Sequence, residues 1–378
     1  MTGKIPIFFT LEHGSCGIEK VNGILVIFYT ILAMKNNTAI DLFCGAGGLT
    51  CGLKQAGFRV LAGIELLQIA AETYSANHHS TLVFQEDICN LSPKEVMQAL
   101  SLKSGELSLL AGCPPCQGFS TLRTYRKASS VTDARNDLIF EFLRWVKVFM
   151  PKCIMLENVP ALAKNRRMEI AMSQLKELGY HINDSSLRIE NIADYGVPQR
   201  RFRMILIASL YGSINEPKKS AIKATVKDAI ADLPKAGISG DPLHDLLAQH
   251  SEKTQKLFSL IPKNGGNRTD LPEEYWLECH KRYPKGFTDV YGRMSWDEVA
   301  PTITGGCVSP SKGRFLHPEE NRAITLREAA LLQTFPKDYH FSLRRGKGSA
   351  ALMIGNALPP AFIRQQGEVI AEHLASLS

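Results

Sequence analysis

The sequence predicts an α/β fold built on a parallel sheet with helices on both faces, followed by a smaller and irregular second domain. From Thr38 to Ser209, short apolar runs alternate with longer amphipathic stretches, which is the pattern of repeated strand–helix units. After Ser209 the alternation stops, and residues 210–320 are rich in Pro, Gly, Asn and charged side chains.

Each apolar run is interpreted as a strand and each amphipathic stretch as a helix. The expected strands lie at 38–43, 59–64, 82–84, 107–111, 153–156 and 204–208. The expected helices lie near 49–56, 66–77, 93–101, 137–149 and 168–178, with a last one at about 360–377. Ligands of such sheets bind beyond the carboxyl ends of the strands, so the residues after each run are the functional candidates.

Four parts of the chain are expected. Residues 34–209 form the domain built on the sheet, 210–340 the second domain, and 341–378 a segment that returns to the first domain. Residues 1–33 are predicted to be an extension outside the fold; an extra packed strand and a targeting segment are the alternatives. The apolar run at 24–34 is too short to cross a bilayer, which needs about 20 residues, and no small-residue cleavage site follows it.

Composition narrows the class of protein. Of 378 residues, 44% are hydrophobic and 21% charged, which is typical of a globular protein and excludes collagen, coiled-coil and disordered classes. The net charge of +7 fits a polyanionic partner without requiring one. Nine cysteines, an odd number in a chain of this length, argue against a disulfide scaffold and for a reducing compartment.

A glycine-rich turn follows the first expected strand. The segment from Asp41 to Gly48 (DLFCGAGG) places Gly45, Gly47 and Gly48 where a helix begins, so that backbone N–H groups can approach a ligand. The pattern departs from the dinucleotide-binding fingerprint at its sixth position, which is Thr50 instead of Gly.

Two acidic residues follow the next two strands. Glu65 lies twenty residues after Gly45, where a carboxylate can accept hydrogen bonds from both ribose hydroxyls. Asp87, followed by Ile88, comes after the third strand and could accept from an adenine amino group. Together with the glycine turn, these residues indicate a cofactor that contains adenosine.

Two cysteines, Cys113 and Cys116, flank a Pro-Pro pair after the fourth expected strand. A redox pair and half of a zinc site are possible interpretations of this spacing. Zinc is disfavoured, and no metal is predicted, because the other seven cysteines are scattered and no nearby His completes a ligand set. The third interpretation is one nucleophilic thiol on a stiff turn, with Cys113 structural.

Further polar residues lie at two other strand ends. Glu157 and Asn158 follow the fifth apolar run, and Arg201 and Arg203 share one face of the strand that enters 204–208. A thiol, a carboxylate and paired guanidinium groups at one sheet edge would form an activated-nucleophile site. The alternatives are a helix-capping role for Glu157 and a solvated face for the arginines.

Six segments, taken in order, resemble the signature motifs of the DNA (cytosine-5)-methyltransferases, and the resemblance runs from about Thr38 to the C-terminus. The segments are FCGAGG at 43–48, PCQ at 115–117, ENV at 157–159, QRRFR at 199–203, RAITLREAALLQTFP at 322–336 and GNALPP at 355–360. The resemblance implies a class I S-adenosylmethionine-dependent methyltransferase (Rossmann-like) fold with a mixed, mostly parallel sheet. It also implies that 210–340 contains the smaller, irregular target-recognition domain.

By this resemblance, Cys116 would attack C6 of cytosine, which makes C5 electron-rich enough to accept a methyl group. Glu157 would be protonated and would hydrogen-bond or protonate N3. Arg203, with Arg201 nearby, would hold O2, and Asn158 would brace the turn that carries the thiol.

The same resemblance implies the cofactor S-adenosyl-L-methionine, with S-adenosyl-L-homocysteine as the product. Its pocket would be formed by Phe43, Gly45, Gly47, Gly48, Glu65, Asp87, Ile88 and Asn356. Leu66 and Leu67 follow Glu65 where the family often carries an aromatic or a further acid, so stacking on the adenine is not implied there.

Basic charge is concentrated beside the expected chemistry. Segments 118–135, 199–203 and 344–347 each carry a net charge of +3, and together they exceed the +7 of the whole chain, whereas 211–320 has 15 basic and 15 acidic residues. The three segments suit phosphate contacts.

A cytosine must leave the duplex to meet a thiol, and residues 120–135 could close over it. Base reading is assigned to 211–320, with 302–306 as the DNA-facing turn.

The predicted function is sequence-specific methylation of cytosine C5 in double-stranded DNA by base flipping. A monomeric bacterial or phage modification enzyme is expected, cytoplasmic, without a membrane partner and paired with a restriction endonuclease. Methylation of tRNA is the first alternative; a thiol oxidoreductase using Cys113 and Cys116, and an inactive DNA-binding module, are the others.

Overall fold

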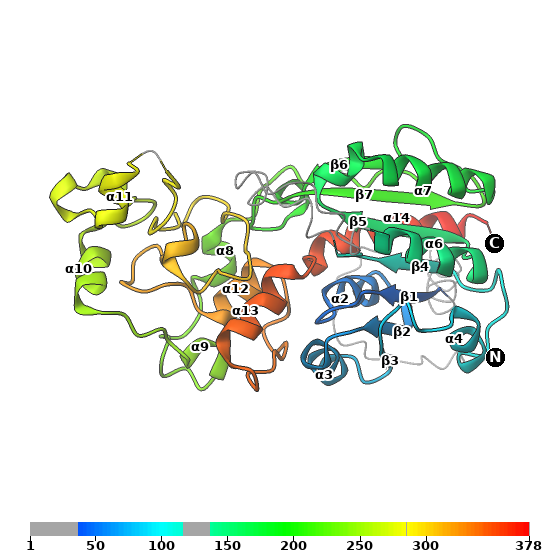
Figure 1. Ribbon diagram of the computed structural model, residues 1–378, viewed down its shortest axis with the longest axis horizontal. Helices are drawn as coiled ribbons and strands as arrows, with labels where there is room; N and C mark the ends of the chain where they lie inside the picture. The colour runs from blue at the N-terminus through cyan, green and yellow to red at the C-terminus, as the bar shows by residue number, and fades with distance from the viewer. Residues whose placement is uncertain (1–36, 116–136, 285, 378) are drawn as a thin grey trace, which may run out of the picture.

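The computed structural model describes residues 37–115, 137–284 and 286–377, and its first part is a seven-stranded sheet between helices (Figure 1). The strand order is β3-β2-β1-β4-β5-β7-β6. Strand β7 runs in the opposite direction to the other six strands, so the predicted mixed, mostly parallel α/β sheet is confirmed. The strands are β1 Thr38–Leu42, β2 Arg59–Glu65, β3 Leu82–Gln85, β4 Leu109–Gly112, β5 Cys153–Asn158, β6 Leu187–Asn191 and β7 Phe202–Ser209.

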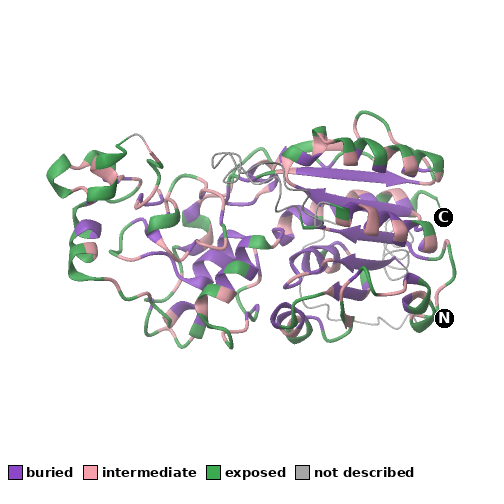
Figure 2. Ribbon diagram, viewed as in Figure 1, coloured by how far each residue is buried: buried purple, intermediate pink, exposed green. Residues whose placement is uncertain are grey.

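Helices cover both faces of the sheet because successive strand residues are apolar and point to opposite sides. Ala39, Leu109 and Met155 pack with α2 and α14, whereas Ile40 and Leu110 pack with α4, α6 and α7. The central strands β1, β4 and β5 are accordingly buried along their length, whereas the edge strands β3 and β6 are more exposed (Figure 2). The helices are α2 Gly48–Gln55, α3 Gln68–Asn77, α4 Pro93–Ala99, α6 Leu138–Phe149, α7 Arg166–Glu177 and α14 Pro360–Ala375, with 3₁₀ turns η3 Pro160–Lys164 and η4 Ile192–Tyr195.

The chain reverses direction across the sheet at β1. It runs from β1 outward to β2 and β3, then returns to place β4 on the other side of β1 and continues to β5. The loops after β1 and β4 therefore diverge at their carboxyl ends, and such a reversal point is where open α/β sheets bind their ligands.

Strand β7 lies between β5 and β6 and runs antiparallel to both, with Asn158 opposite Met204 and Asn191 opposite Phe202. Its first residues therefore lie at the edge where the parallel strands end. Strand β6 was not predicted, because its sequence LRIEN mixes polar and apolar residues at the sheet margin and contains no apolar run.

The second part of the chain is built from short elements around its own hydrophobic cluster (Figure 1). Helices α12 and α13 lie at its centre, and the cluster continues into Ala46 and Cys51 beside α2. The C-terminal segment 341–378 is expected to return to the first domain. Its helix α14 packs on the sheet of that domain, whereas its helix α13 packs with α12 in the second part. The elements are α8 Val226–Ile230, α9 Pro242–Asp245, α10 Glu252–Leu260, η5 Arg268–Asp270, η6 Glu273–Tyr275, α11 Glu278–Arg282, η7 Pro310–Lys312, α12 Leu326–Leu332 and α13 Gly346–Asn356.

A buried arginine organises the irregular segments of this part. The guanidinium of Arg293 is fully buried and donates to the carbonyl oxygens of Phe258, Ile261 and His317 at 2.6–3.1 Å. Backbone carbonyls that no helix or strand satisfies thus find a donor inside the cluster.

Gly355 on α13 tests how closely this helix packs on the turn at 302–306 within the second part of the chain. A Cβ there would lie 2.1 Å from the carbonyl carbon of Thr304, whereas a Cβ at Gly348 on the same helix would meet no atom within 4 Å. We expect Gly355→Ala to lower the free energy of unfolding by about 1–3 kcal/mol through overpacking. Gly348→Ala should leave it unchanged or raise it by up to about 1 kcal/mol through helix propensity. Urea unfolding of both variants measures this, and equal stabilities would contradict the close approach.

Candidate active site

The glycine turn predicted after β1 is tied to the end of β2. The backbone N–H of Gly45 donates to Glu65 Oε2 at 2.9 Å, and that of Leu67 donates to Glu65 Oε1 at 2.8 Å. Burial raises the pKa of the Glu65 carboxyl group. Each oxygen of the Glu65 carboxylate can accept a further hydrogen bond, so the group can still bind a hydroxyl donor.

Two residues that no sequence motif indicated, His78 and Tyr339, bind backbone carbonyls of the glycine turn. Tyr339 donates its hydroxyl to the carbonyl of Ala46 at 2.6 Å, and His78 Nε2 lies 3.2 Å from the carbonyl of Gly47 and 3.0 Å from the Tyr339 oxygen. Burial lowers the pKa of His78 to about 4, so the ring is neutral. Because the carbonyl oxygen of Gly47 can only accept, the proton of that ring is assigned to Nε2. Gly47 has φ +94°, and a Cβ there would lie 2.4 Å from His78 Nε2.

Thr50, which breaks the dinucleotide fingerprint, has a structural partner. Its hydroxyl donates to Asp41 Oδ2 at 2.7 Å and lies 2.7 Å from the Tyr74 hydroxyl. Asp41 is fully buried, and burial raises its pKa to about 7. A glycine at position 50 would leave these buried polar groups without that partner.

The remaining predicted cofactor residues lie at the same sheet edge. Asp87 and Ile88 follow β3, and the guanidinium of Arg144 on α6 fixes their loop by donating to the carbonyl of Ile88. Phe43 adopts the left-handed conformation at φ 62°. Asn356 is exposed at the end of α13, and the following chain presses on α2, where a Cβ at Gly48 would lie 2.4 Å from the carbonyl oxygen of Leu358.

Three of the predicted catalytic residues, Glu157, Asn158 and Arg203, lie together beside the ends of β4 and β5. Arg203 Nε lies 2.8 Å from Glu157 Oε1, an ion pair in which the carboxylate is 4% exposed. Cys113 donates its thiol to Glu157 Oε2, and Asn158 Nδ2 donates to the carbonyl of Pro114 at 2.9 Å. Cys116 and the expected lid at 120–135 lie outside the described residues, which resume after Pro115 at Asp137.

Arg201 and Arg203 have different surroundings. Arg201 is buried, and its Nη1 donates to the carbonyls of Ile303 and Gly355 at 2.8 and 3.0 Å. Burial, followed by the charge of Arg203, lowers the pKa of Arg201 to about 9. Gln199 accepts from the backbone N–H of Ile303 at 2.8 Å. The predicted DNA-facing turn at 302–306 is therefore anchored directly to the start of β7.

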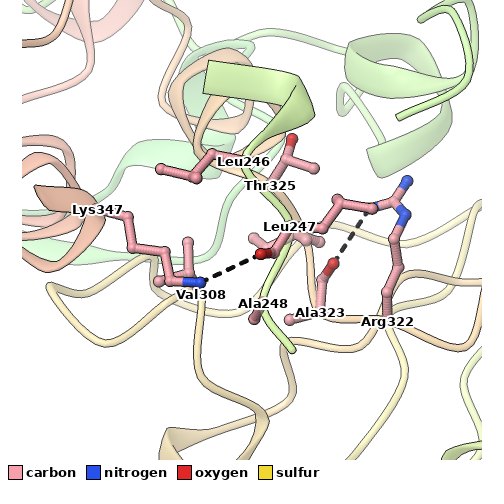
Figure 3. A pocket seen from close by; sticks show the side chains of 9 residues that line it. Leu246, Leu247, Ala248, Val308, Arg322, Ala323, Thr325 and Lys347 are labelled. Carbon is pink, nitrogen blue, oxygen red and sulfur yellow. Dashed lines mark hydrogen bonds between the residues drawn. The ribbon is translucent and has the colours of Figure 1, made fainter. Parts of the chain in front are cut away.

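Two hollows lie away from the Glu157 edge. One, of about 400 Å³, lies behind the glycine turn between α2, α3 and residues 336–339, and both His78 and Tyr339 line it. The other, of about 10 Å³, lies in the second part beside Lys347 and Arg322 (Figure 3) and has room for about one water molecule. Among residues 37–115, 137–284 and 286–377, no group of three His, Cys, Asp or Glu side chains is arranged to hold a metal ion.

The fold and this edge define the class of protein, an α/β enzyme with a glycine turn after β1 beside a carboxylate–guanidinium pair. The family of C-5 cytosine-specific DNA methylases matches residues 37–372, and the chain belongs to it. The match begins after the predicted extension at 1–33, which itself lies outside the described residues.

Several relatives are similar over most of their length. Type II methylase M.HgiDII of Herpetosiphon aurantiacus is 38% identical over 349 residues, covering 89% of this chain and 94% of the relative. Type II methyltransferase M1.HphI of Haemophilus parahaemolyticus is 35% identical, covering 88% and 86%. Among solved structures, a prophage-encoded Escherichia coli protein assigned as a DNA modification methyltransferase superposes with a TM-score of 0.65 at 26% identity, covering 90% and 100%.

Asn158→Asp tests the brace on the Pro-Pro turn. The change keeps the oxygen that accepts from the Val159 N–H but places a carboxylate oxygen against the carbonyl of Pro114. We expect the free energy of unfolding to fall by about 1–3 kcal/mol, measured by urea denaturation. Asn165→Asp is the matched control, because Asn165 caps α7 by accepting a hydrogen bond and Asp caps equally well. An equal loss in both variants would contradict a specific brace.

Proposed function

We propose that this methylase modifies cytosine C5 within a defined sequence of double-stranded DNA, using S-adenosylmethionine and a base flipped out of the duplex. The observation that carries the proposal is the Glu157–Arg203 ion pair at 2.8 Å, next to the braced Pro114-Pro115 turn that leads to Cys116. The type II relatives support a role as the bacterial, cytoplasmic modification partner of a restriction endonuclease. One flipped base requires one site, which suits a monomer.

The family and the fold imply S-adenosylmethionine, and the residues after β1 to β3 fit it. A Cβ at Gly45 would meet no atom within 4 Å, so the turn has open space beside it. Glu65 would accept from the ribose, Asp87 and Ile88 would border the adenine, and Phe43, Gly47, Gly48 and Asn356 would complete the pocket. When bound, the cofactor supplies an electrophilic methyl group.

The chemistry assigned to the chain begins with the Cys116 thiolate, which would form a bond to C6 of the cytosine. The C5–C6 π electrons then make C5 electron-rich, while negative charge develops toward N3 and O2. Glu157 would donate a proton or hydrogen bond to N3, and Arg203 would hold O2. After methylation, a base or water would accept the C5 proton, the C5–H electrons would re-form the C5–C6 double bond, and the C6–S bond would break to release the Cys116 thiolate.

Arg201 would contribute indirectly to O2 binding. Its hydrogen bonds to the carbonyls of Ile303 and Gly355 fix the start of β7, from which Arg203 projects. The family resemblance implies that both arginines lie near O2, and the ion pair of Arg203 with Glu157 favours Arg203 for the direct contact.

Duplex DNA would bind beside this edge. Arg344 and Arg345 are exposed where α13 begins, and Arg200 is exposed before β7, so all three can contact phosphates. The second part of the chain would contain the target-recognition domain, with the turn at 302–306 facing the DNA. None of the helices in the described ranges has the length and hydrophobicity needed to cross a membrane.

Covalent trapping tests the nucleophile. With cofactor present, a duplex containing 5-fluorocytosine at the target site should form a stable adduct, because fluorine at C5 prevents the elimination that frees the sulfur. Cys116→Ala should form no adduct and should lower the methylation rate by at least about 10³-fold. Denaturing electrophoresis and a tritium-transfer assay measure the two quantities.

Cys279→Ala is the control for loss of an exposed cysteine and should behave as wild type. Persistence of the adduct in Cys116→Ala would overturn the assignment. An adduct that forms with 5-fluorocytosine tRNA and not with duplex DNA would establish the RNA alternative.

Tyr339→Phe tests the support behind the cofactor turn. Loss of the hydrogen bond to Ala46 should weaken S-adenosylmethionine binding by about fivefold, the value of one net hydrogen bond of about 1 kcal/mol, measured by isothermal titration calorimetry. Tyr180→Phe is the matched control, because Tyr180 donates to the carbonyl of Pro151 before β5, at the opposite sheet edge. The same affinity change in both variants would contradict a specific effect on the turn.

A further inference from the structure

Cys113, the cysteine that the family resemblance leaves without a chemical role, contacts the carboxylate assigned to catalysis. It is the first residue after β4, and its backbone N–H donates to the carbonyl of Leu42 on β1 at 3.2 Å. Its thiol donates to Glu157 Oε2 on the neighbouring strand β5. The contact therefore joins the ends of two adjacent strands at the proposed active site.

The carboxylate of Glu157 is bound on both oxygens. Arg203 pairs with Oε1 from β7, and Cys113 donates to Oε2 from β4. The pKa of the Cys113 thiol lies well above its usual range because of burial and the neighbouring Glu157 charge. The sulfur consequently retains its proton near neutral pH and acts as a donor, which separates its chemistry from that of a nucleophilic thiolate.

The torsion angles of the Glu157 side chain do not by themselves fix the orientation of its carboxyl group. The terminal torsion of a glutamate is broad and weakly restrained, so the plane of the carboxyl group follows its hydrogen-bond partners. A group that must meet N3 of a flipped base requires a defined direction, because small misplacements of catalytic groups cost large factors in rate.

We propose that Cys113 is a positioning residue, whose S–H fixes the orientation of the Glu157 carboxylate for its contact with the flipped cytosine. The inference rests on the proposed function, because it concerns the residue assigned to N3. Arg203 sets one oxygen through charge, and Cys113 sets the other through a neutral donor. A neutral donor suits this position because it orients the carboxylate without adding a second positive charge beside Arg203.

The competing interpretation is that Cys113 only fills space beside the strands, since it also packs against the cluster formed by α2, α14 and the sheet. Thr and Val have nearly the same shape, and only Thr has a hydroxyl donor. Cys113→Thr and Cys113→Val therefore separate hydrogen bonding from packing at constant volume.

The experiment measures kcat and both KM values for full-length wild type and the two variants, with duplex DNA and S-adenosylmethionine. We expect Cys113→Val to lower kcat about tenfold, the value of one hydrogen bond to a charged group. Both KM values should change by less than about twofold, since the contact acts on the chemical step. Cys113→Thr should retain at least half of the wild-type kcat.

Recovery of kcat in Cys113→Thr is the readout that a packing role would not give, because Thr and Val fill nearly the same space and differ in the hydroxyl donor. Arg203, Arg201 and Asp41, the charged or titratable groups that also face this pair, are the same in both variants.

Equal kcat values for the Thr and Val variants, or better activity in Val than in Thr, would overturn the proposal. Loss of the 5-fluorocytosine adduct in both variants would also overturn it, because Cys113 would then be the nucleophile. If circular dichroism shows that a β-branched variant is unfolded, Cys113→Ser and Cys113→Ala form the replacement pair with the same expectations. A wild-type enzyme that does not methylate duplex DNA would instead contradict the proposed function, so the two failures are distinguishable.

Discussion

Antiparallel insertion of β7 between β5 and β6 is the constraint on which the candidate active site depends. In a fully parallel sheet, the residues that begin a strand lie at the opposite edge from those that end its neighbours. Because β7 runs the other way, Arg203 begins its strand where Glu157 ends β5, and the two side chains pair at 2.8 Å. The same reversal leaves Arg201 beside the carbonyls of Ile303 and Gly355.

The two parts of the chain form a continuous structure at this edge. Arg201 of the first part donates to the carbonyls of Ile303 and Gly355 in the second, and the hydrophobic cluster of the second part extends to α2. The glycine turn is supported in the same way, since Tyr339 from the second part and His78 from the first bind consecutive carbonyls of the turn. The geometry of the glycine turn therefore depends on residues far from it in the sequence.

Much of the fold and of the site follows from local pattern. The glycine turn, Glu65, Asp87 and Glu157 each come after an apolar run, and the carboxyl ends of parallel strands share one edge, so their convergence could be predicted. Strand β6 could not, because a polar edge strand has no apolar run. Helix α13 could not be predicted either, because its sequence (GKGSAALMIGN) is rich in glycine and its hydrophobic residues do not form one continuous face.

Motif order and residue type were enough to predict the α/β class, the family resemblance and the residues proposed for chemistry. Only the tertiary structure decided which side chains form hydrogen bonds with one another. Tyr339 and His78 are 261 positions apart, and Cys113 and Glu157 are 44 apart. Hydrogen bonds across such separations leave no periodicity in the sequence, because they depend on how strands and helices are placed in space and not on the residues next to them in the chain.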